Sequence, residues 1–139
     1  MREILFRGKV PEDSRDEELR EKWVEGNLVH QTEYYGSPVD RYHILYTGEF
    51  HCDFYDSVEV VPKTVGQFTG LLDKNGTKIF EGDIIYNGHG YPGVVKWSYG
   101  TFIVRFAVGD DWDISQYVKE EYTEIIGNIY DNPELLEVE

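Results

Sequence analysis

The sequence predicts a mainly β protein, built as a small antiparallel barrel with an N-terminal extension. Three observations support this fold class. Short runs of β-branched and aromatic residues recur along the chain. From Thr64 onward, turn signals separate these runs at spacings of roughly 8–12 residues, as in small β-barrels and sandwiches. Aromatic residues make up 15% of the 139 residues, which supplies the buried area that a small core requires.

Residues 1–60 are predicted to form a β-hairpin or meander that packs on the barrel. Strand composition is found in four segments: residues 3–9, Trp23–His30, Tyr42–Tyr46 and Val58–Val60. The connection over residues 11–22 is almost entirely charged and has two interpretations. The capping-box pattern from Ser14 to Glu17 favours a short surface helix, whereas an exposed hairpin loop would join the flanking strands directly.

Residues 61–139 are predicted to form the barrel, which a hairpin opens. The apolar runs GQFTGLL and TKIF flank the tetrad Asp73-Lys74-Asn75-Gly76. An Asn-Gly pair between apolar runs indicates a tight primed turn, in which both residues adopt a positive φ. A second turn follows at Glu81-Gly82-Asp83, and a new strand begins at Ile84.

The segment Ile84–Phe106 has the layout of an SH3-like barrel: a strand, a Gly-rich loop, a strand that ends in Trp97, a short turn and another strand. The turn is expected at Ser98-Tyr99-Gly100-Thr101. In the strand that follows it, alternation places Phe102, Val104 and Phe106 on one face. We therefore predict a small SH3-like antiparallel barrel from Val61 to Glu139.

The C-terminal segment closes this predicted domain. Ser115–Glu121 has the composition of a final strand or a helical turn, and Tyr122–Tyr130 that of a strand. Asn132 followed by Pro133 is typical of a helix N-cap with proline at the first helical position. We expect a single helical turn there, which docks Leu135 and Leu136.

Three parts of the chain together carry a family resemblance. They are VPKTVGQFTGLLDKNGTKIFEGDII (Val61–Ile85), the strand with Val94, Val95 and Trp97, and Glu124–Tyr130. These residues resemble the YopX-like family of phage and prophage proteins, closely over about the last 80 residues and loosely over the first 60. The resemblance implies a phage or prophage origin, supports the barrel and favours the hairpin loop over residues 11–22. It implies no particular biochemical activity.

The charge of the chain excludes some classes of function. The net charge is −14, and residues 101–139 hold two basic and ten acidic residues. So acidic a chain repels a phosphate backbone, which disfavours nucleic acid as a partner. No apolar run approaches the roughly 18 residues that span a bilayer, and the N-terminus has no signal-peptide pattern. The single cysteine, Cys52, suits a reducing compartment, so we expect a cytoplasmic protein.

Two clusters of residues contain side chains that can bind metals or act in catalysis. The trio His51-Cys52-Asp53 combines metal-ligating and nucleophilic residues. In a strand Cys52 would point away from His51 and Asp53, so a cysteine–histidine dyad is disfavoured, and a metal site of His51 and Asp53 with His43 remains an alternative. The aspartates around Trp112 do not match the ligand spacing of an EF-hand loop.

The Gly-rich loop from Asn87 to Gly93 lacks the Lys-Ser/Thr of a phosphate-binding loop and is followed by a strand pattern. It suits a contact loop between two strands instead. We expect an interaction surface made of aromatic and acidic residues: His89, Tyr91, Trp97, Asp110, Asp111, Trp112 and Asp113. The alternative is that the aromatic rings pack the barrel.

Three functions of different classes follow from these features. The first is a non-enzymatic protein-interaction module that binds a host or phage protein, with homo-oligomers as one form of it. The second is an acidic mimic of nucleic acid that binds a basic, DNA-binding host protein. The third is an enzyme or metal protein that uses His51 and Asp53. The first is preferred, because the sequence shows no catalytic constellation, and with it we expect no cofactor.

Overall fold

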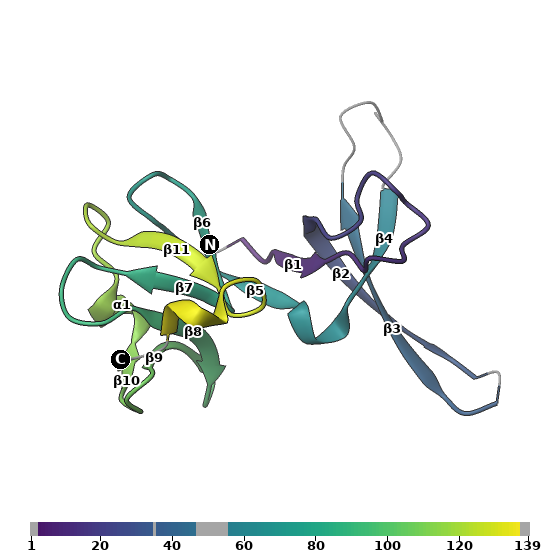
Figure 1. Cartoon of the computed structure of the whole chain (residues 1–139). Helices are drawn as coiled ribbons and strands as arrows, with labels where there is room; N and C mark the ends of the chain where they lie inside the picture. Colours follow the sequence, from purple (N-terminus) through teal and green to yellow (C-terminus); the bar gives the residue numbers. More distant parts are fainter. Residues whose placement is uncertain (1–2, 35, 47–55, 137–139) are drawn as a thin grey trace. The chain divides into compact units, whose positions relative to one another are not determined.

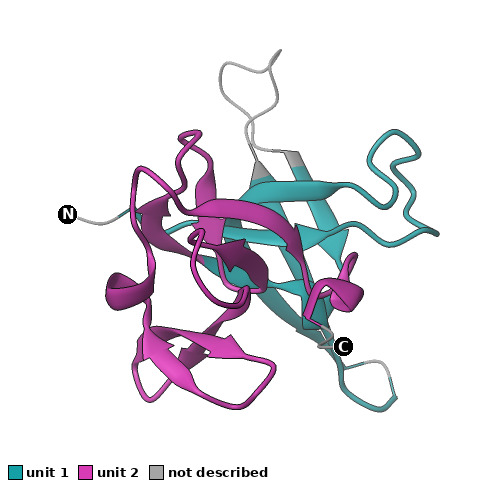
Figure 2. Cartoon of the chain, turned by 60° about the vertical axis from the view of Figure 1, so that its left-hand side comes forward, with its two compact units in different colours: residues 1, 3–67 teal, residues 2, 68–139 magenta. Residues whose placement is uncertain are grey.

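The computed structural model of the chain describes residues 3–34, 36–46 and 56–136. It confirms a mainly β protein, whose strands pair in two antiparallel sheets (Figure 1). The described chain divides into two compact units, residues 3–67 and residues 68–139, which Figure 2 colours separately. Every helix among the described residues is too short or too polar to cross a lipid bilayer.

The first unit is an antiparallel meander. Its elements are β1 (Phe6–Lys9), β2 (Trp23–Glu33), β3 (Val39–Tyr46), β4 (Asp56–Val60), the 3-10 helix η1 (Pro62–Thr64) and the beginning of β5 (Gly66–Leu72). Each strand from β1 to β4 pairs with the next one, and β1 also pairs with β5. Of the two predicted forms, a hairpin or a meander, the strand pairing is that of a meander, with β2 and β3 as its long hairpin (Figure 1).

The core of the first unit is small and made mostly of β-branched side chains. Its buried members are Val10, Val24, Ile44, Val58 and Val60. The glycine of β2, Gly26, lies close to the β3 backbone, and a Cβ added to it would collide with the carbonyl oxygen of Leu45. A glycine inside this strand therefore allows a close approach of two backbones, although glycine disfavours strands in general.

The connection over residues 11–22 is a loop, and the alternative of a surface helix is wrong. Its two ends are joined like a hairpin, because Val10 N donates to Lys22 O over 2.9 Å and Glu21 N donates to Val10 O over 3.0 Å. Isolated turns lie between them, and Leu19 packs against the core of the unit. The Ser14 hydroxyl accepts from Asp16 N at 3.2 Å and therefore organises a local turn instead of a helix N-terminus.

Along the chain, the boundary between the two units falls between Gln67 and Phe68. The sequence predicts it after residue 60. The intervening residues hold to β1 by hydrogen bonds. Val61 N donates to Lys9 O over 2.9 Å, and Lys9 N donates to the Thr64 hydroxyl over 2.9 Å. These contacts join η1 to the meander, and no composition change in the sequence marks them.

The second unit contains the rest of β5, β6 (Lys78–Phe80), β7 (Asp83–Tyr86), β8 (Gly93–Ser98), β9 (Thr101–Phe106), β10 (Asp111–Asp113), the helical turn α1 (Ile114–Tyr117), β11 (Glu124–Asn128) and the 3-10 helix η2 (Pro133–Leu136). Its main sheet has the strand order β10-β9-β8-β7-β11, and β5 and β6 pair at the end of the other sheet, in the order β4-β3-β2-β1-β5-β6.

The main sheet of the second unit is open. In the described ladders β10 and β11 each pair on one side, so they are the edges of the sheet. The expected order of strand, loop, strand, turn and strand is present in β7, β8 and β9. The closed SH3-like barrel is not confirmed. The strands β5 and β6 belong to the other sheet, and the edge strands β10 and β11 do not pair with each other in the described sheet.

The hairpin at residues 73–77 is confirmed, but its turn type was predicted wrongly. Of Asn75 and Gly76 only Gly76 has a positive φ, of 79°. Gly76 N donates to Asp73 O and Asp73 N donates to Thr77 O, which is the pattern of a three-residue loop with glycine at the bulge. The primed turn of this unit lies between β8 and β9 instead, at Tyr99 (φ 51°) and Gly100 (φ 81°).

The core of the second unit consists of buried residues from β6 to β9 and from α1: Ile79, Ile85, Val95, Phe102, Val104, Ile114 and Tyr117. Ser115–Glu121 begins as a helical turn, which removes the alternative of a strand. The predicted C-terminal turn is present as η2, where Leu135 N donates to Asn132 O over 3.1 Å. Phe102 and Val104 point into the core as the alternation predicted, and Phe106 lies at its margin.

Candidate functional site

The loop between β7 and β8 is shaped by one asparagine. Asn87 Oδ1 accepts from His89 N at 2.9 Å, and Asn87 Nδ2 donates to the carbonyl oxygen of Tyr117 over 3.2 Å. Gly88 and Gly90 have φ values of 89° and 72°, in the left-handed region that favours glycine. The glycines let the chain turn, and Asn87 fixes the base of the loop to the end of α1.

Tyr117 joins this loop to the core. The side chain is 2% exposed, and its hydroxyl donates to the Tyr91 carbonyl oxygen over 2.9 Å, with the Ile85 carbonyl oxygen at 3.3 Å as a second acceptor. The same oxygen accepts from Asn87 N at 3.2 Å. Burial raises the pKa of the Tyr117 phenol above its usual value, and the hydrogen bond from Asn87 opposes this shift. Tyr117 therefore stays neutral and holds both ends of the loop.

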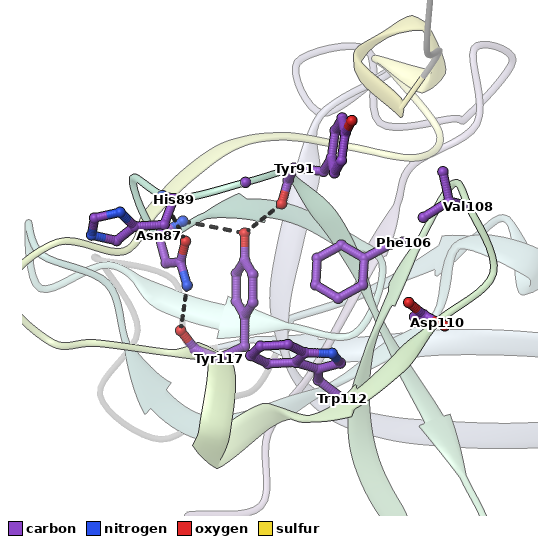
Figure 3. Close-up of a pocket in the computed structure, with 9 residues that line it drawn as sticks. Asn87, His89, Tyr91, Phe106, Val108, Asp110, Trp112 and Tyr117 are labelled. Carbon is purple, nitrogen blue, oxygen red and sulfur yellow. Dashed lines mark hydrogen bonds between the residues drawn. The ribbon is translucent and has the colours of Figure 1, made fainter.

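A pocket of about 370 Å³ opens between this loop and the β9–β10 turn (Figure 3). Its volume is at the small end of the range for ligand pockets, roughly 300–1,000 Å³. Aromatic and aliphatic side chains dominate its lining, which consists of Asn87, His89, Gly90, Tyr91, Phe106, Val108, Asp110, Trp112 and Tyr117. All these residues belong to the second unit.

The aromatic rings of the pocket stand at steep angles to one another. The Phe106 and Trp112 centroids are 6.0 Å apart with an interplanar angle of 85°, and the Phe106 and Tyr117 centroids are 5.4 Å apart at 60°. In Figure 3 the Phe106 ring lies between Tyr91 and Trp112. These are edge-to-face and tilted contacts of the kind that aromatic pairs prefer, here between residues that line the pocket.

The pocket leaves large apolar groups open to solvent. Tyr91 is 55% exposed, Trp112 49% and Val108 62%. Val108 sits in the β9–β10 turn, where Phe106 N donates to Asp110 O over 3.0 Å and Gly109 has a φ of 94°. These three exposed apolar side chains all line the same pocket.

The charged side chains near the pocket are mostly carboxylates, and two of them form ion pairs or hydrogen bonds with neighbouring residues. The Arg105 guanidinium binds Asp111 through two hydrogen bonds of 2.8 and 3.1 Å, and the bond from Arg105 lowers the pKa of that carboxyl. Asp113 caps α1 by accepting from Ser115 N and from the Ser115 hydroxyl, whose hydrogen bond lowers the pKa of Asp113. Asp110 lines the pocket itself.

Four of the seven residues predicted for the interaction surface line this pocket: His89, Tyr91, Asp110 and Trp112. Trp97 does not. It is 48% exposed on β8 and packs edge-on against Phe102, with 4.8 Å between the ring centroids. Asp111 and Asp113 lie beside Trp112 on β10 but have the structural roles just described.

Sequence reasoning did not assign Phe106, Val108, Asn87 or Tyr117 to the site. A signal for Phe106 was present, because the alternation of β9 places it on the same face as Phe102 and Val104, one step beyond the buried residues. Tyr117 gave no such signal, since its role depends on hydrogen bonds to residues 26 and 30 positions earlier in the chain.

The other candidate sites are the His51-Cys52-Asp53 trio and a polar cleft in the first unit. His51, Cys52 and Asp53 lie outside the described residues, and His43 stands opposite Glu59 in the β3–β4 ladder. Within residues 3–34, 36–46 and 56–136, no three metal-ligating side chains come together. A polar cleft in the first unit contains Arg41, which forms ion pairs with Glu33 and Glu59 over 3.2 and 2.8 Å and so offsets one of their two negative charges.

Comparison with known proteins gives a family and a fold. The model of the family described as YopX protein matches residues 6–137. The crystal structure of protein EF1440 from Enterococcus faecalis is similar over 99% of this chain and 100% of that chain, with a TM-score of 0.54 and 22% sequence identity. At this identity the similarity concerns the fold alone. No curated protein matches the chain.

Proposed function

The chain belongs to the YopX protein family, and we propose that it is a non-enzymatic module that binds another protein through the aromatic pocket of its second unit. The observation that carries the proposal is the exposure of Tyr91 and Trp112 around one concave space. Tryptophan and tyrosine supply much of the binding energy of protein interfaces, because they bury large areas with few rotatable bonds.

The polar groups of the pocket support binding over catalysis. In the part of the chain that the structure describes, no hydrogen bond links the His89 ring to Asp110, and Tyr117 uses its hydroxyl to hold the backbone. A catalytic base is typically oriented by a further side chain, and the described lining offers His89 no such partner. The lining is better suited to bury a side chain of a partner.

The position of the pocket in the fold gives further support. We propose that the β7–β9 segment is related to SH3-like domains in its strand order, in which aromatic side chains between strands bind peptides. The loop from Asn87 to Gly93 and the β9–β10 turn hold the exposed aromatic and aliphatic residues here. Because the family resemblance implies phage origin, we place the partner among host or phage proteins.

Two tryptophans make a matched pair for the test. Trp112 and Trp97 are 49% and 48% exposed, and each packs edge-on against a phenylalanine of β9. We would compare quantitative affinity capture from a lysate of the source organism by the wild type, Tyr91→Ala/Trp112→Ala and Trp97→Ala. We expect the pocket variant to capture roughly 10-fold less of a partner than the wild type, or less still, which is the effect of losing a central interface residue. Trp97→Ala should capture as much of it as the wild type.

A different capture result would contradict the proposed interaction through the pocket. Proteins captured in the same amounts by all three chains would contradict the proposal, provided that circular dichroism shows intact folds. Size-exclusion chromatography with light scattering, run alongside, tests the proposed homo-oligomer. If a second copy of the chain is the partner, Tyr91→Ala/Trp112→Ala reduces the molar mass and Trp97→Ala leaves it unchanged.

The acidic mimic of nucleic acid is the second candidate, and the charge of the chain favours it: −14 overall, with ten acidic and two basic residues in 101–139. Two aspartates of the expected interaction surface suit this role less well, because Arg105 neutralises Asp111 and Asp113 caps α1. A mimic would bind a DNA-binding protein that DNA displaces and that salt releases. Competition by duplex DNA in the capture experiment would distinguish it from a pocket-based interaction.

A further inference from the structure

We infer that the aromatic pocket is selective for a cationic side chain, that of an arginine or lysine presented by the partner. This inference rests on the proposed function and names the chemistry of the group that enters the pocket. The supporting observations are the angles between the rings, the charge of the lining and the volume of the space.

The ring geometry is that of an incomplete cage. Phe106 stands at 85° to Trp112 and at 60° to Tyr117, and Figure 3 shows the Tyr91 ring on the side of Phe106 opposite to Trp112. The rings that line this space therefore lie in planes of different orientation. Ring faces carry negative electrostatic potential and attract cations within about 6 Å of the centroid. A cation thus gains from several rings at once, whereas a neutral group gains only apolar contact.

The charge of the lining points to the same occupant. Among the lining residues that the structure describes, Asp110 is the one carboxylate, and none is a lysine or an arginine. Residues 105–113 hold one cation, Arg105, and three carboxylates, which gives −2. Arg105 is bound to Asp111 by two hydrogen bonds, and the described residues place no donor on the Asp110 carboxylate. Asp110 is therefore available to a cation in the pocket.

The size of the pocket and the charge of the molecule agree with a single basic side chain. A volume of about 370 Å³ suits one long side chain better than a folded motif. The net charge of −14 attracts basic partners over long distances and repels acidic ones. A proline-rich peptide would also pack on aromatic rings, but it would make no use of Asp110.

The test uses two small probes of nearly equal shape and different charge. N-acetyl-arginine methylamide and N-acetyl-citrulline methylamide are titrated into the full chain, and NMR follows the Trp112 indole and the backbone amides of His89 and Gly90. We expect saturable shifts with the arginine probe and affinity lower by about 5-fold or more for the neutral citrulline probe, the size of exposed cation–π and ion-pair contacts combined.

Single substitutions separate charge from apolar contact. Asp110→Asn should weaken the arginine probe by about 2- to 5-fold and leave the citrulline probe unchanged, because it removes only the anion. Trp112→Ala should weaken both probes, and the arginine probe more. Trp97→Ala, a tryptophan of equal exposure outside the pocket, should change neither. Asp111→Asn is not used as a control, because it releases Arg105.

The outcomes distinguish this inference from the proposed function. Equal affinities for the two probes, or no binding of the arginine probe, would overturn cation selection. The protein-interaction role would still stand if Tyr91→Ala/Trp112→Ala loses its partner in the capture experiment. Conversely, cation-selective binding with unchanged capture would establish the cation site and remove the protein-interaction role.

Discussion

Tyr117 holds the wall of the pocket in place, because its hydroxyl forms hydrogen bonds with the backbone at both ends of the β7–β8 loop. We predict that Tyr117→Phe lowers the free energy of unfolding by about 1–2 kcal/mol, since Asn87 N and the Tyr91 carbonyl lose their partner. Urea denaturation measures this loss. Tyr122→Phe is the matched control, as Tyr122 is 62% exposed, and a Tyr117→Phe chain as stable as this control would contradict the prediction.

The same residue gives a pH dependence with a defined sign. Burial raises the folded-state pKa of Tyr117 above its ordinary value of about 10. The unfolded chain therefore loses this proton first as the pH rises, so the contribution of Tyr117 is complete below about pH 10 and decreases above it. Denaturation curves between about pH 8 and about pH 11 should show a smaller decrease in the free energy of unfolding for Tyr117→Phe than for Tyr122→Phe.

At the scale of elements, two hairpin turns of the second unit share one backbone pattern. In residues 73–77 and 106–110 the first and last residues pair, and a glycine with positive φ occupies the fourth position. The first turn has an additional support, because the 6% exposed Asp73 carboxylate accepts from Asn75 N, Thr77 N and Ile125 N. The second has no such group at Phe106, and there the exposed Val108 lines the pocket.

Asp73 should therefore be essential for the β5–β6 hairpin and its link to β11. We predict that Asp73→Ala lowers the free energy of unfolding by about 2–3 kcal/mol, since three amide groups lose a charged acceptor. Asp73→Asn should lie between Asp73→Ala and the wild type, because one oxygen still serves the turn while the amide nitrogen cannot accept from Ile125. A change below about 0.5 kcal/mol in Asp73→Ala would be typical of an unconnected surface residue and would refute this role.

At the scale of the whole molecule, the net charge dominates the electrostatics. With 27 acidic and 13 basic residues, the folded chain repels itself more than the unfolded chain does. We predict that the melting temperature rises as sodium chloride increases from about 0.02 to 0.5 M, because the Debye length falls from about 20 Å to a few ångströms. Differential scanning calorimetry checks this.

A variant with fewer charges provides the control for the salt effect. Glu120→Gln/Glu121→Gln removes two exposed carboxylates and changes the net charge from −14 to −12. Its melting temperature should respond less to salt than that of the wild type. A melting temperature that falls with salt in both chains would mean that ion pairs such as Arg105–Asp111 outweigh the general repulsion.

Local sequence patterns predicted the mainly β class, a hairpin or meander in the first 60 residues, the hairpins of the second unit and the C-terminal turn, because alternation and turn chemistry act over a few neighbouring residues. The sequence also placed Tyr91 and Trp112 in an expected interaction surface, with packing inside the barrel as the alternative. Only the tertiary structure decided that the main sheet is open, that Trp97 lies outside the pocket and that Tyr117 holds its wall. These features depend on strand pairing and on hydrogen bonds between residues far apart in the chain, which local patterns do not encode.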